Sequence, residues 1–554
     1  MKRKLYDIRK FIIWTVVIIA INVFANLKFF RIDLTEDQRY SISESTVQLL
    51  DTLQERLIVQ VYLDGELTGN YQHLQKTVEE TLDEMKAYAG SHLAIEFVDP
   101  FSLEDSIRDE TLKKLQAYGL KVRTQQSFQE AGMEQKAVVP GALVQLGSKV
   151  ISINFLKDGR NGMEENFDQS ISEVEYEFAS AIKVLTQERK KRIAFVDGHG
   201  EAPSQLLDRM FYELANYYQV GRIDLASVPE VEGVEALVIV KPRSAYSDLD
   251  KYKLDQYVMN GGRLLFFVDA IESRKDSLGE GIMGLPFELG LDNLLRQYGV
   301  RIGENQIQDL QAATMPVQVE NGQMKLMPWN FHPLLETFSD HIITKGLNPV
   351  LAKNLGIIDT VKAEGLKKTP LIMSSKYTRL KGSPVTYSPD EIRFNTDPSY
   401  YPQSYLPVAY LLEGRVNSLY ENRPLPLGAS SKPKINQCDG ARIFVCADGD
   451  IILNEFDPKS GRVSPMGLNT FTGDTYANKR FAMNLFNYML DEQGVVNLRS
   501  KEVKIRDLDV FAIDDDSEQI KWQVINIVFP VLLILGFGIL RHFIRKGRYE
   551  KRVS

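Results

Sequence analysis

Two long apolar runs, one near each end of the chain, constrain its fold more than any other feature. Residues 11–27 read FIIWTVVIIAINVFANL, and residues 522–540 read WQVINIVFPVLLILGFGIL. A helix that crosses the hydrocarbon core of a membrane needs about 17 to 25 mostly apolar residues, and both runs satisfy this requirement. We therefore expect a transmembrane helix at 11–27 and another at 522–540.

The charges beside these runs predict how the chain is oriented. Residues 1–10 and residues 541–554 are rich in lysine and arginine, and basic flanks stay on the cytoplasmic side of a membrane. No small-residue cleavage site of the A-x-A type follows the first run, so we expect an uncleaved anchor and not a signal peptide. The prediction is a protein of the inner (plasma) membrane with both termini cytoplasmic and its main body periplasmic.

Length and composition limit the number of domains and the classes of partner that this body can have. A chain of 554 residues is too long for one hydrophobic core, so two or more domains are expected. The net charge is −8 and no cationic stripe lies in the main body, which argues against a nucleic-acid partner. The only two cysteines, Cys438 and Cys446, form no CxxC motif, and the sequence leaves open whether they pair with each other.

The pattern of residues 28–169 predicts a small α/β domain. Apolar runs such as LIVQVYLDG and LAIEFVDP alternate with amphipathic helical segments, and ALVQLGSKVISINFL indicates a hairpin around Gly147. This β-α-β-α-β-β order is thioredoxin-like in outline, without the cysteines of redox chemistry. A connecting helix is expected at 170–191, where Ser170 and Glu173 have the spacing of a capping box.

A second α/β domain is predicted from near-continuous apolar strands. RIAFVDG, ALVIVKP and RLLFFVDA alternate with helical segments, as in a doubly wound parallel sheet covered by helices on both faces. Residues 272–440 are broken by proline and glycine, and we interpret them as an irregular insertion. The expected parts are residues 192–271 for the first part of the domain, 441–510 for its second part and 511–521 for a linker to the apolar run.

Polar side chains follow two strands of this predicted sheet. His199 and Glu201 lie in the turn after the first strand, and Asp448 and Asp450 follow the strand that ends at Cys446. Parallel strands send their carboxyl ends to one edge, where ligands usually bind. We therefore expect the four residues to line one acidic rim without nearby basic side chains, as a contact surface for a partner or ligand. The alternative is that the turns have only a structural role.

Catalysis is not the favoured prediction. H-x-E supplies only two metal ligands, and no third histidine accompanies it at a suitable spacing. A nucleophile elbow around Cys446 would need glycine at 444 and 448, where the chain has Phe444 and Asp448. We predict no catalytic residue, metal or cofactor. A membrane-tethered thiol hydrolase or amidotransferase that uses Cys446 and His199 remains the alternative from the enzyme class.

Several motifs follow one another along the chain in the same order as in a known protein family. GHGEAP, LVIVKPRSAYSD, YVMNGGRLLFFVDA, CADGDIILNEFD and YANKRFAMNLFNYMLD follow one another as in the gliding-motility-associated ABC transporter auxiliary, or substrate-binding, proteins of the Bacteroidetes. The resemblance implies an amidotransferase-like second domain without a working triad. It also implies a polytopic ABC permease and a separate cytoplasmic ATPase as partners, consistent with the lack of a P-loop motif in this chain.

We therefore predict a non-enzymatic auxiliary subunit of an ABC transporter that acts in gliding motility or associated secretion. A purely scaffolding protein of the cell envelope is a further alternative, because scaffolding and solute binding both need only a well-formed exported surface. The sequence does not distinguish a small-molecule ligand from a protein partner.

Overall fold

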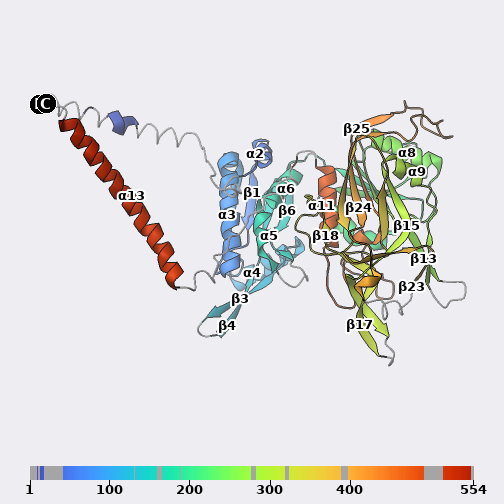
Figure 1. Ribbon diagram of the computed structural model, residues 1–554, viewed down its shortest axis with the longest axis horizontal. Coiled ribbons are helices and arrows are strands. Elements are labelled where there is room, and N and C mark those ends of the chain that lie inside the picture. Colours follow the sequence, from blue (N-terminus) through green and yellow to red (C-terminus); the bar gives the residue numbers. More distant parts are fainter. Residues whose placement is uncertain are drawn as a thin grey trace. The chain divides into compact units, whose positions relative to one another are not determined.

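The protein is a mixed α/β structure, as predicted (Figure 1). The computed structural model describes residues 9, 13–17, 42–129, 132–158, 165–187, 189–275, 282–318, 323–387, 397–491, 494 and 516–550. It divides into two compact units, residues 1–502 and residues 503–554, and each is described by itself.

The first part of the larger unit is built on a four-stranded sheet in the order β2-β1-β5-β6. β1 is parallel to β2 and antiparallel to β5, and β5 and β6 form the predicted hairpin around Gly147. The alternate residues of β1 are buried, as expected for a strand with one face on a core. The elements are α2 (Glu44–Asp51), β1 (Leu57–Val61), α3 (Gly69–Ala89), β2 (Leu93–Phe97), α4 (Asp105–Ala117), β3 (Arg123–Gln129), β4 (Gly132–Val138), β5 (Gly141–Leu146) and β6 (Lys149–Asn154).

The predicted connecting helix is two helices, α5 (Phe167–Ser172) and α6 (Val174–Thr186). The capping-box prediction was wrong because the helix begins earlier, with Asn166 as its N-cap. Ser170 lies inside α5, where its hydroxyl donates to the Asn166 carbonyl and accepts from the Lys157 amide. Glu173, expected in the box, forms an ion pair with Arg480 at 2.6 Å. A further short pair, β7 (Lys157–Asp158) and β8 (Glu165–Asn166), precedes α5.

The second part is built on an eight-stranded sheet in the order β10-β9-β11-β12-β25-β24-β21-β18. The first five strands are parallel and the last three are antiparallel to their neighbours. The strands of this sheet are β9 (Arg192–Asp197), β10 (Gln219–Asp224), β11 (Ala236–Val240), β12 (Arg263–Phe267), β18 (Thr337–Phe338), β21 (Leu366–Met373), β24 (Pro407–Asn417) and β25 (Gln437–Cys446).

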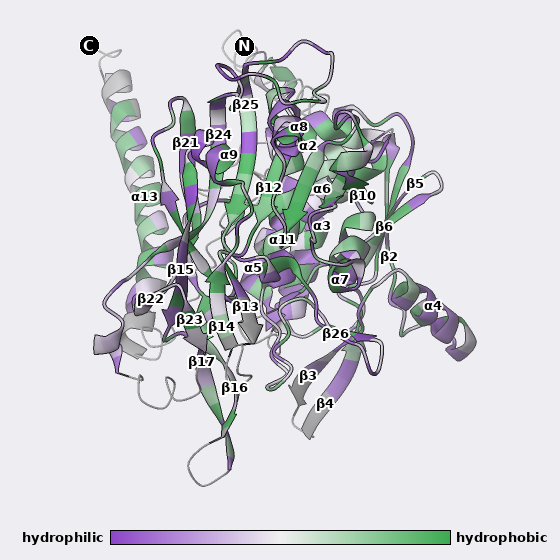
Figure 2. Ribbon diagram, turned by 90° about the vertical axis from the view of Figure 1, so that its right-hand side faces the viewer, coloured by the Kyte–Doolittle hydropathy of each residue, from purple (hydrophilic) through white to green (hydrophobic). Residues whose placement is uncertain are grey.

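Helices cover both faces of the parallel strands. All five residues of β11 are buried, which explains its unbroken apolar sequence. Its Val238 packs in the same core as α7 and α11, whereas its Leu237 and Ile239 pack with α8 and α9. Figure 2 shows the apolar colour concentrated in these central strands. The helices are α7 (Ser204–Ala215), α8 (Asp248–Met259), α9 (Asp292–Gln297) and α11 (Asn478–Leu490).

The interpretation of residues 272–440 as irregular was wrong for much of that segment. It supplies the three antiparallel strands of the large sheet and several small sheets. The prolines argued against strands in the sequence, but proline is tolerated at strand ends and irregular positions. Pro407 begins β24, and Pro370 precedes a register shift in β21. The small sheets of this segment contain β13 (Ile271–Lys275), β14 (Ile282–Pro286), β15 (Val300–Asp309), β16 (Ala312–Gln318), β17 (Met324–Leu335), β19 (Val350–Leu351), β20 (Gly356–Thr360), β22 (Thr378–Gly382) and β23 (Val385–Tyr387). After β25, β26 (Phe456–Asp457) and β27 (Arg462–Val463) form a separate two-stranded sheet.

The second unit contains the helix α13 (Asp516–Glu550), and its segment Val524–Ile544 is long and apolar enough to cross a membrane. This is the one such helix among the residues that the structure describes. α13 begins inside the segment 511–521 that we expected to be a linker. Within the first apolar run only residues 13–17 are described, and they are helical; the rest of 11–27 lies outside the described residues, as do 495–510.

Candidate functional site at the carboxyl edge of the sheet

Four neighbouring parallel strands, β9, β11, β12 and β25, end at one edge of the large sheet. The turns after β9 and β25 therefore share an edge, as predicted. The turns after the two strands between them add further charged residues. The charged or titratable residues after the four strands include His199 and Glu201 (β9), Lys241 and Arg243 (β11), Asp269 (β12), and Asp448 and Asp450 (β25).

His199 is the centre of a first group, which we call the histidine cluster. Its Nδ1 lies 3.4 Å from Glu201 Oε1 and its Nε2 lies 3.3 Å from Asp250 Oδ2. Its ring stacks on that of Tyr246, with centroids 3.7 Å apart. The Tyr246 hydroxyl donates to Glu201 Oε1 at 2.6 Å, and the His199 amide donates to Glu201 Oε2 at 2.7 Å. The cluster thus links the turn after β9 to the start of α8.

The two carboxylates favour a protonated imidazole. Burial by itself lowers the pKa of His199, but hydrogen bonds and charge attraction from Glu201 and Asp250 outweigh burial, so the pKa is raised above 6.5. Burial raises the pKa of Glu201, but its hydrogen bonds with His199 and Tyr246 outweigh this and lower it overall. A protonated imidazole carries its charge between two carboxylates here; Nε2 is hydrogen-bonded to Asp250, whereas Nδ1, 3.4 Å from Glu201, makes an ion-pair contact without a hydrogen bond.

The histidine cluster predicts a pH-dependent stability. A raised folded-state pKa gives stabilisation that is fully present below the unfolded pKa of 6.5 and is lost as the pH rises through the folded pKa. His199→Gln should therefore destabilise the protein more at about pH 5.5 than at about pH 8.5. Denaturant unfolding of the purified protein at both pH values measures this difference. His73→Gln, at an exposed position, is the control, and equal losses at both pH values for His199→Gln would contradict the assignment.

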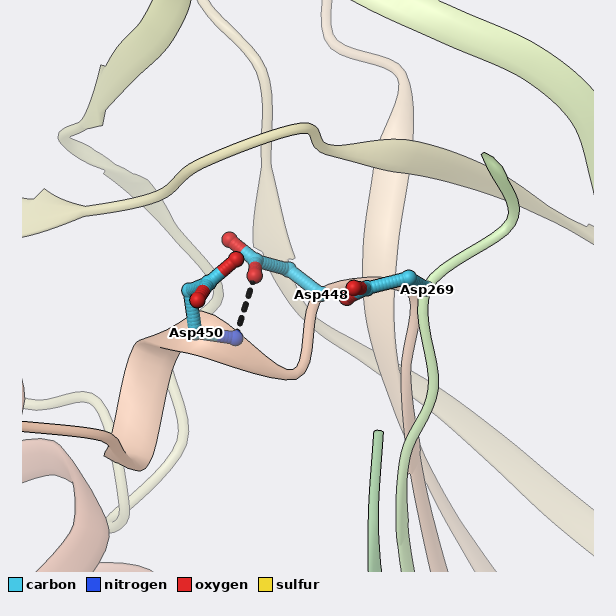
Figure 3. A group of neighbouring side chains, drawn as sticks. All are labelled: Asp269, Asp448 and Asp450. Atoms are coloured by element: carbon cyan, nitrogen blue, oxygen red, sulfur yellow. Dashed lines mark hydrogen bonds between the residues drawn. The ribbon is translucent and has the colours of Figure 1, made fainter. Parts of the chain in front are cut away.

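A second group, which we call the lysine cluster, consists of Lys241, Asp269, Asp448 and Asp450. Carboxylate oxygens of the three aspartates lie within 4.8 Å of one another, a donor set that suits Mg²⁺ or Ca²⁺. The Asp448 and Asp450 side chains point toward each other and Asp269 approaches from a neighbouring strand (Figure 3). However, the Lys241 ammonium lies 2.9 Å from Asp269 and 2.6 Å from Asp450, so the chain itself supplies a cation here.

Burial and charge together set the protonation of the lysine cluster. Burial raises the pKa of Asp448 well above its usual range, and it also raises that of Asp269. Burial lowers the pKa of Lys241, but the neighbouring Asp450 and Asp269 outweigh this and raise it overall. Asp448 accepts from the amides of Asp450 at 2.6 Å and Lys353 at 2.7 Å. These directions favour a charged Lys241 and disfavour the simultaneous ionisation of all three aspartates.

Gly449 makes room for Lys241. Its amide donates to Asp269 Oδ1 at 2.7 Å, and a Cβ at this position would lie 2.0 Å from Lys241 Cγ. Gly449→Ala should therefore lower the free energy of unfolding by about 1 to 3 kcal/mol, the usual cost of overpacking a core. Gly440→Ala, in the strand β25 that precedes this turn, is the control, because a Cβ there meets nothing within 4 Å. Equal unfolding midpoints for the two variants would contradict this packing.

The four predicted residues do not line one exposed acidic rim. They fall into two clusters, and three are buried: His199 is 8% exposed, Glu201 7% and Asp448 0%. The expectation that no basic side chain lies nearby was wrong, because Lys241 forms an ion pair with Asp450. The exposed surface at the histidine cluster comes instead from neighbouring residues of the turns: Gly198, Gly200, Pro203, Arg243, Ser244 and Ala245.

Sequence reasoning missed Lys241, Asp269, Tyr246 and Asp250. The first two follow LVIV and LLFFV directly, so applying the carboxyl-edge rule to all the apolar strands would have identified them. Tyr246 and Asp250 lie farther along the chain, and the sequence holds no signal that pairs them with His199.

The region that contains both clusters matches a known protein family. A family model described as "ABC-type uncharacterized transport system" matches residues 190–485, which is more than half of the chain. The chain belongs to this family of ABC transport auxiliary proteins. The auxiliary-family match spans the large sheet and both clusters at its carboxyl edge. A second model, described as a domain of unknown function, matches residues 36–145.

Two individual proteins are also similar to this chain, but neither indicates a function for it. An uncharacterized protein of Borreliella burgdorferi is 20% identical over 547 residues, which is 95% of this chain and 96% of that protein. Among solved structures, the mmIFT52 N-terminal domain is 10% identical and the match covers 54% of this chain and 96% of that one. Its TM-score of 0.31 is too low to establish a shared fold.

In this member of the auxiliary family, Cys446 does not have the surroundings of a nucleophile. Its side chain is 0% exposed, and burial raises the pKa of its thiol well above the usual value, which disfavours the reactive thiolate. Two strands separate β9 from β25, so at about 4.8 Å per spacing the strands that carry His199 and Cys446 lie about 14 Å apart. This arrangement does not form a Cys-His pair.

Proposed function

We propose that the protein is a non-enzymatic auxiliary subunit of an ABC transporter, anchored in the inner membrane beside a polytopic permease and a cytoplasmic ATPase. The match of residues 190–485 to the ABC transport auxiliary family is the observation that carries this proposal. The narrower assignment to gliding motility or associated secretion rests on the motif resemblance alone.

The proposed topology has both termini in the cytoplasm and the body in the periplasm. α13 supports it, because its segment Val524–Ile544 can span a bilayer and its apolar side chains are exposed. Basic residues follow the middle of this helix at Arg541, Arg545 and Lys546, which favours a cytoplasmic end. The first anchor, at residues 11–27, rests on its sequence.

We also propose the thioredoxin-like and amidotransferase-like descriptions for the two parts of the body. The order β2-β1-β5-β6, with β1 and β2 parallel and a terminal hairpin, supports the first description. The five parallel strands between two helical layers support the second. The antiparallel extension through β24, β21 and β18 is an addition to a doubly wound sheet.

The carboxyl edge is the proposed partner contact. The exposed backbone and side chains of Gly200, Arg243 and Ser244 would meet the partner, and His199 and Glu201 would fix the shape of that surface from beneath. The His199 carbonyl already accepts the amides of Arg243 at 2.8 Å and Ser244 at 2.9 Å. Asp448 and Asp450 would hold the adjacent strands together in the lysine cluster.

Replacing Cys446 distinguishes an auxiliary subunit from a thiol enzyme. Cys446→Ala removes one buried sulfur atom, so we expect a modest loss of stability, on the order of 1 kcal/mol, and unchanged transporter function in cells. The measurement is transport-dependent growth or motility, together with the amount of folded protein in the membrane. Complete loss of function at a normal protein level would support the enzyme instead.

A further inference from the structure

A cavity of about 790 Å³ lies at the amino edge of the parallel strands, opposite the candidate site. Its lining comes from the loop 229–235 before β11, from α8 and the residues before β12, from 430–435 and from the end of α11. This volume falls within the range of about 300 to 1,000 Å³ that is typical of ligand pockets. The cavity therefore has room for a segment of another molecule.

The cavity combines an apolar wall with a carboxylate rim. Val234, Ile435 and Leu490 contribute to the apolar wall. The loop 229–235 contributes three glutamates, Glu230, Glu232 and Glu235, whose side chains are 26%, 67% and 25% exposed; Glu235 is already paired with Arg189 at 3.1 Å, which leaves Glu230 and Glu232 as the rim for a cation. The α8 helix also ends here, and the carbonyls at a helix end attract positive charge. Such a lining favours a ligand that has both an apolar part and a cation.

The three cations of the lining are already engaged. The buried Lys253 ammonium donates to the Leu225 carbonyl at 2.6 Å. The Arg263 guanidinium donates to the carbonyls of Gly261 at 2.9 Å and Gly440 at 3.1 Å. The third cation, Lys432, pairs with two carboxylates of the rim, Glu230 at 2.9 Å and Glu232. An anionic ligand would find no cation here without an existing partner.

Lys432 belongs to an exposed loop, residues 421–436, which we call the strap. The Lys432 side chain is 58% exposed, and ion pairs at exposed positions stabilise a protein only weakly. Polar contacts fix the strap elsewhere, with Ile435 and Gln256 exchanging two hydrogen bonds at 2.9 and 3.0 Å.

We propose that this cavity binds an extended segment of a partner protein in which arginine or lysine stands beside apolar residues. The cation of that segment replaces Lys432 between Glu230 and Glu232, and its apolar side chains lie against the wall formed by Val234, Ile435 and Leu490. In the free protein Lys432 occupies the position of the partner's cation. The inference concerns the amino edge of the sheet and does not depend on the proposed function of the carboxyl edge.

A peptide titration on the full chain in a neutral detergent tests this proposal. The probe is a fluorescent, end-capped hexapeptide of alternating arginine and leucine, followed by anisotropy. Lys432→Met removes the internal competitor and should tighten binding about fivefold, whereas the Glu230→Gln/Glu232→Gln double variant should weaken it at least tenfold. Glu364→Gln, at an exposed glutamate far along the chain from this rim, is the control and should bind as the wild type does.

Several results would overturn the proposal. One is equal binding by the wild type and the double glutamine variant, since attraction to any acidic surface would then explain the affinity. Another is failure of the Lys432→Met variant to bind while its circular dichroism spectrum stays that of the wild type. A third is binding of dodecyltrimethylammonium but not of the peptide, which would assign the cavity to small amphiphilic cations. Equal binding of a glutamate-leucine hexapeptide would exclude the charge complementarity.

Discussion

Replacing Lys241 with methionine should lower the free energy of unfolding by about 3 to 5 kcal/mol, the usual effect of removing one partner from a buried ion pair. The Lys241 side chain is only 17% exposed and forms ion pairs with Asp269 and Asp450. Without the ammonium, these carboxylates and the buried Asp448 lose their compensating charge at the ends of two neighbouring strands. Denaturant unfolding of the detergent-solubilised protein measures the loss.

Two further variants test whether the loss of stability comes from the buried ion pairs of Lys241. Lys362→Met removes an exposed ion pair with Glu364 and should change the stability by less than about 0.5 kcal/mol. Adding Asp269→Asn and Asp450→Asn to Lys241→Met removes the uncompensated charges and should recover part of the lost stability. If Lys241→Met unfolds at the same denaturant concentration as the wild type, the lysine cluster has no stabilising role.

Removing both terminal segments should release the body from the membrane completely. A transmembrane helix inserts almost irreversibly, so either anchor should suffice by itself. Deleting residues 1–30 or residues 516–554 alone should leave the protein in the membrane pellet after an alkaline wash. Deleting both should move it to the soluble fraction after fractionation of cells that export it through a cleavable signal peptide.

The single deletions serve as the internal controls of this experiment. Release by deletion of residues 516–554 alone would show that the run at 11–27 is not an anchor. Retention of the double deletion in the washed pellet would show that the body itself binds the membrane, which would contradict the proposed topology.

Local sequence patterns predicted those elements whose own residues carry the signal. The apolar runs at 193–196, 236–240 and 264–267 are strands because both faces of a parallel sheet are buried, and this leaves an unbroken apolar signature. The end of α8 could also be predicted, because glycine is favoured just after a helix. Gly261 takes a positive φ of 86° at this position. These features are local consequences of side-chain type.

The pairing of strands from distant segments could not be predicted from the sequence. β24 pairs with β25 and β21, and nothing in the proline- and glycine-rich segment 272–440 predicts those neighbours. The candidate site shows the same limit. The carboxyl-edge rule brought the turns of His199 and Asp448 to one edge, but the burial of both side chains and the position of Lys241 depend on packing between distant segments.

The most direct test of the proposed auxiliary role is the composition of the complex that this chain forms in its own membrane. The full-length protein, carrying an affinity tag at its cytoplasmic carboxyl end, is purified in a mild detergent and its partners are quantified by mass spectrometry. We predict that an ABC permease and its ATPase co-purify in fixed ratio to the chain. Elution of the chain alone, while the permease remains intact with its ATPase in the same extract, would contradict the proposed function.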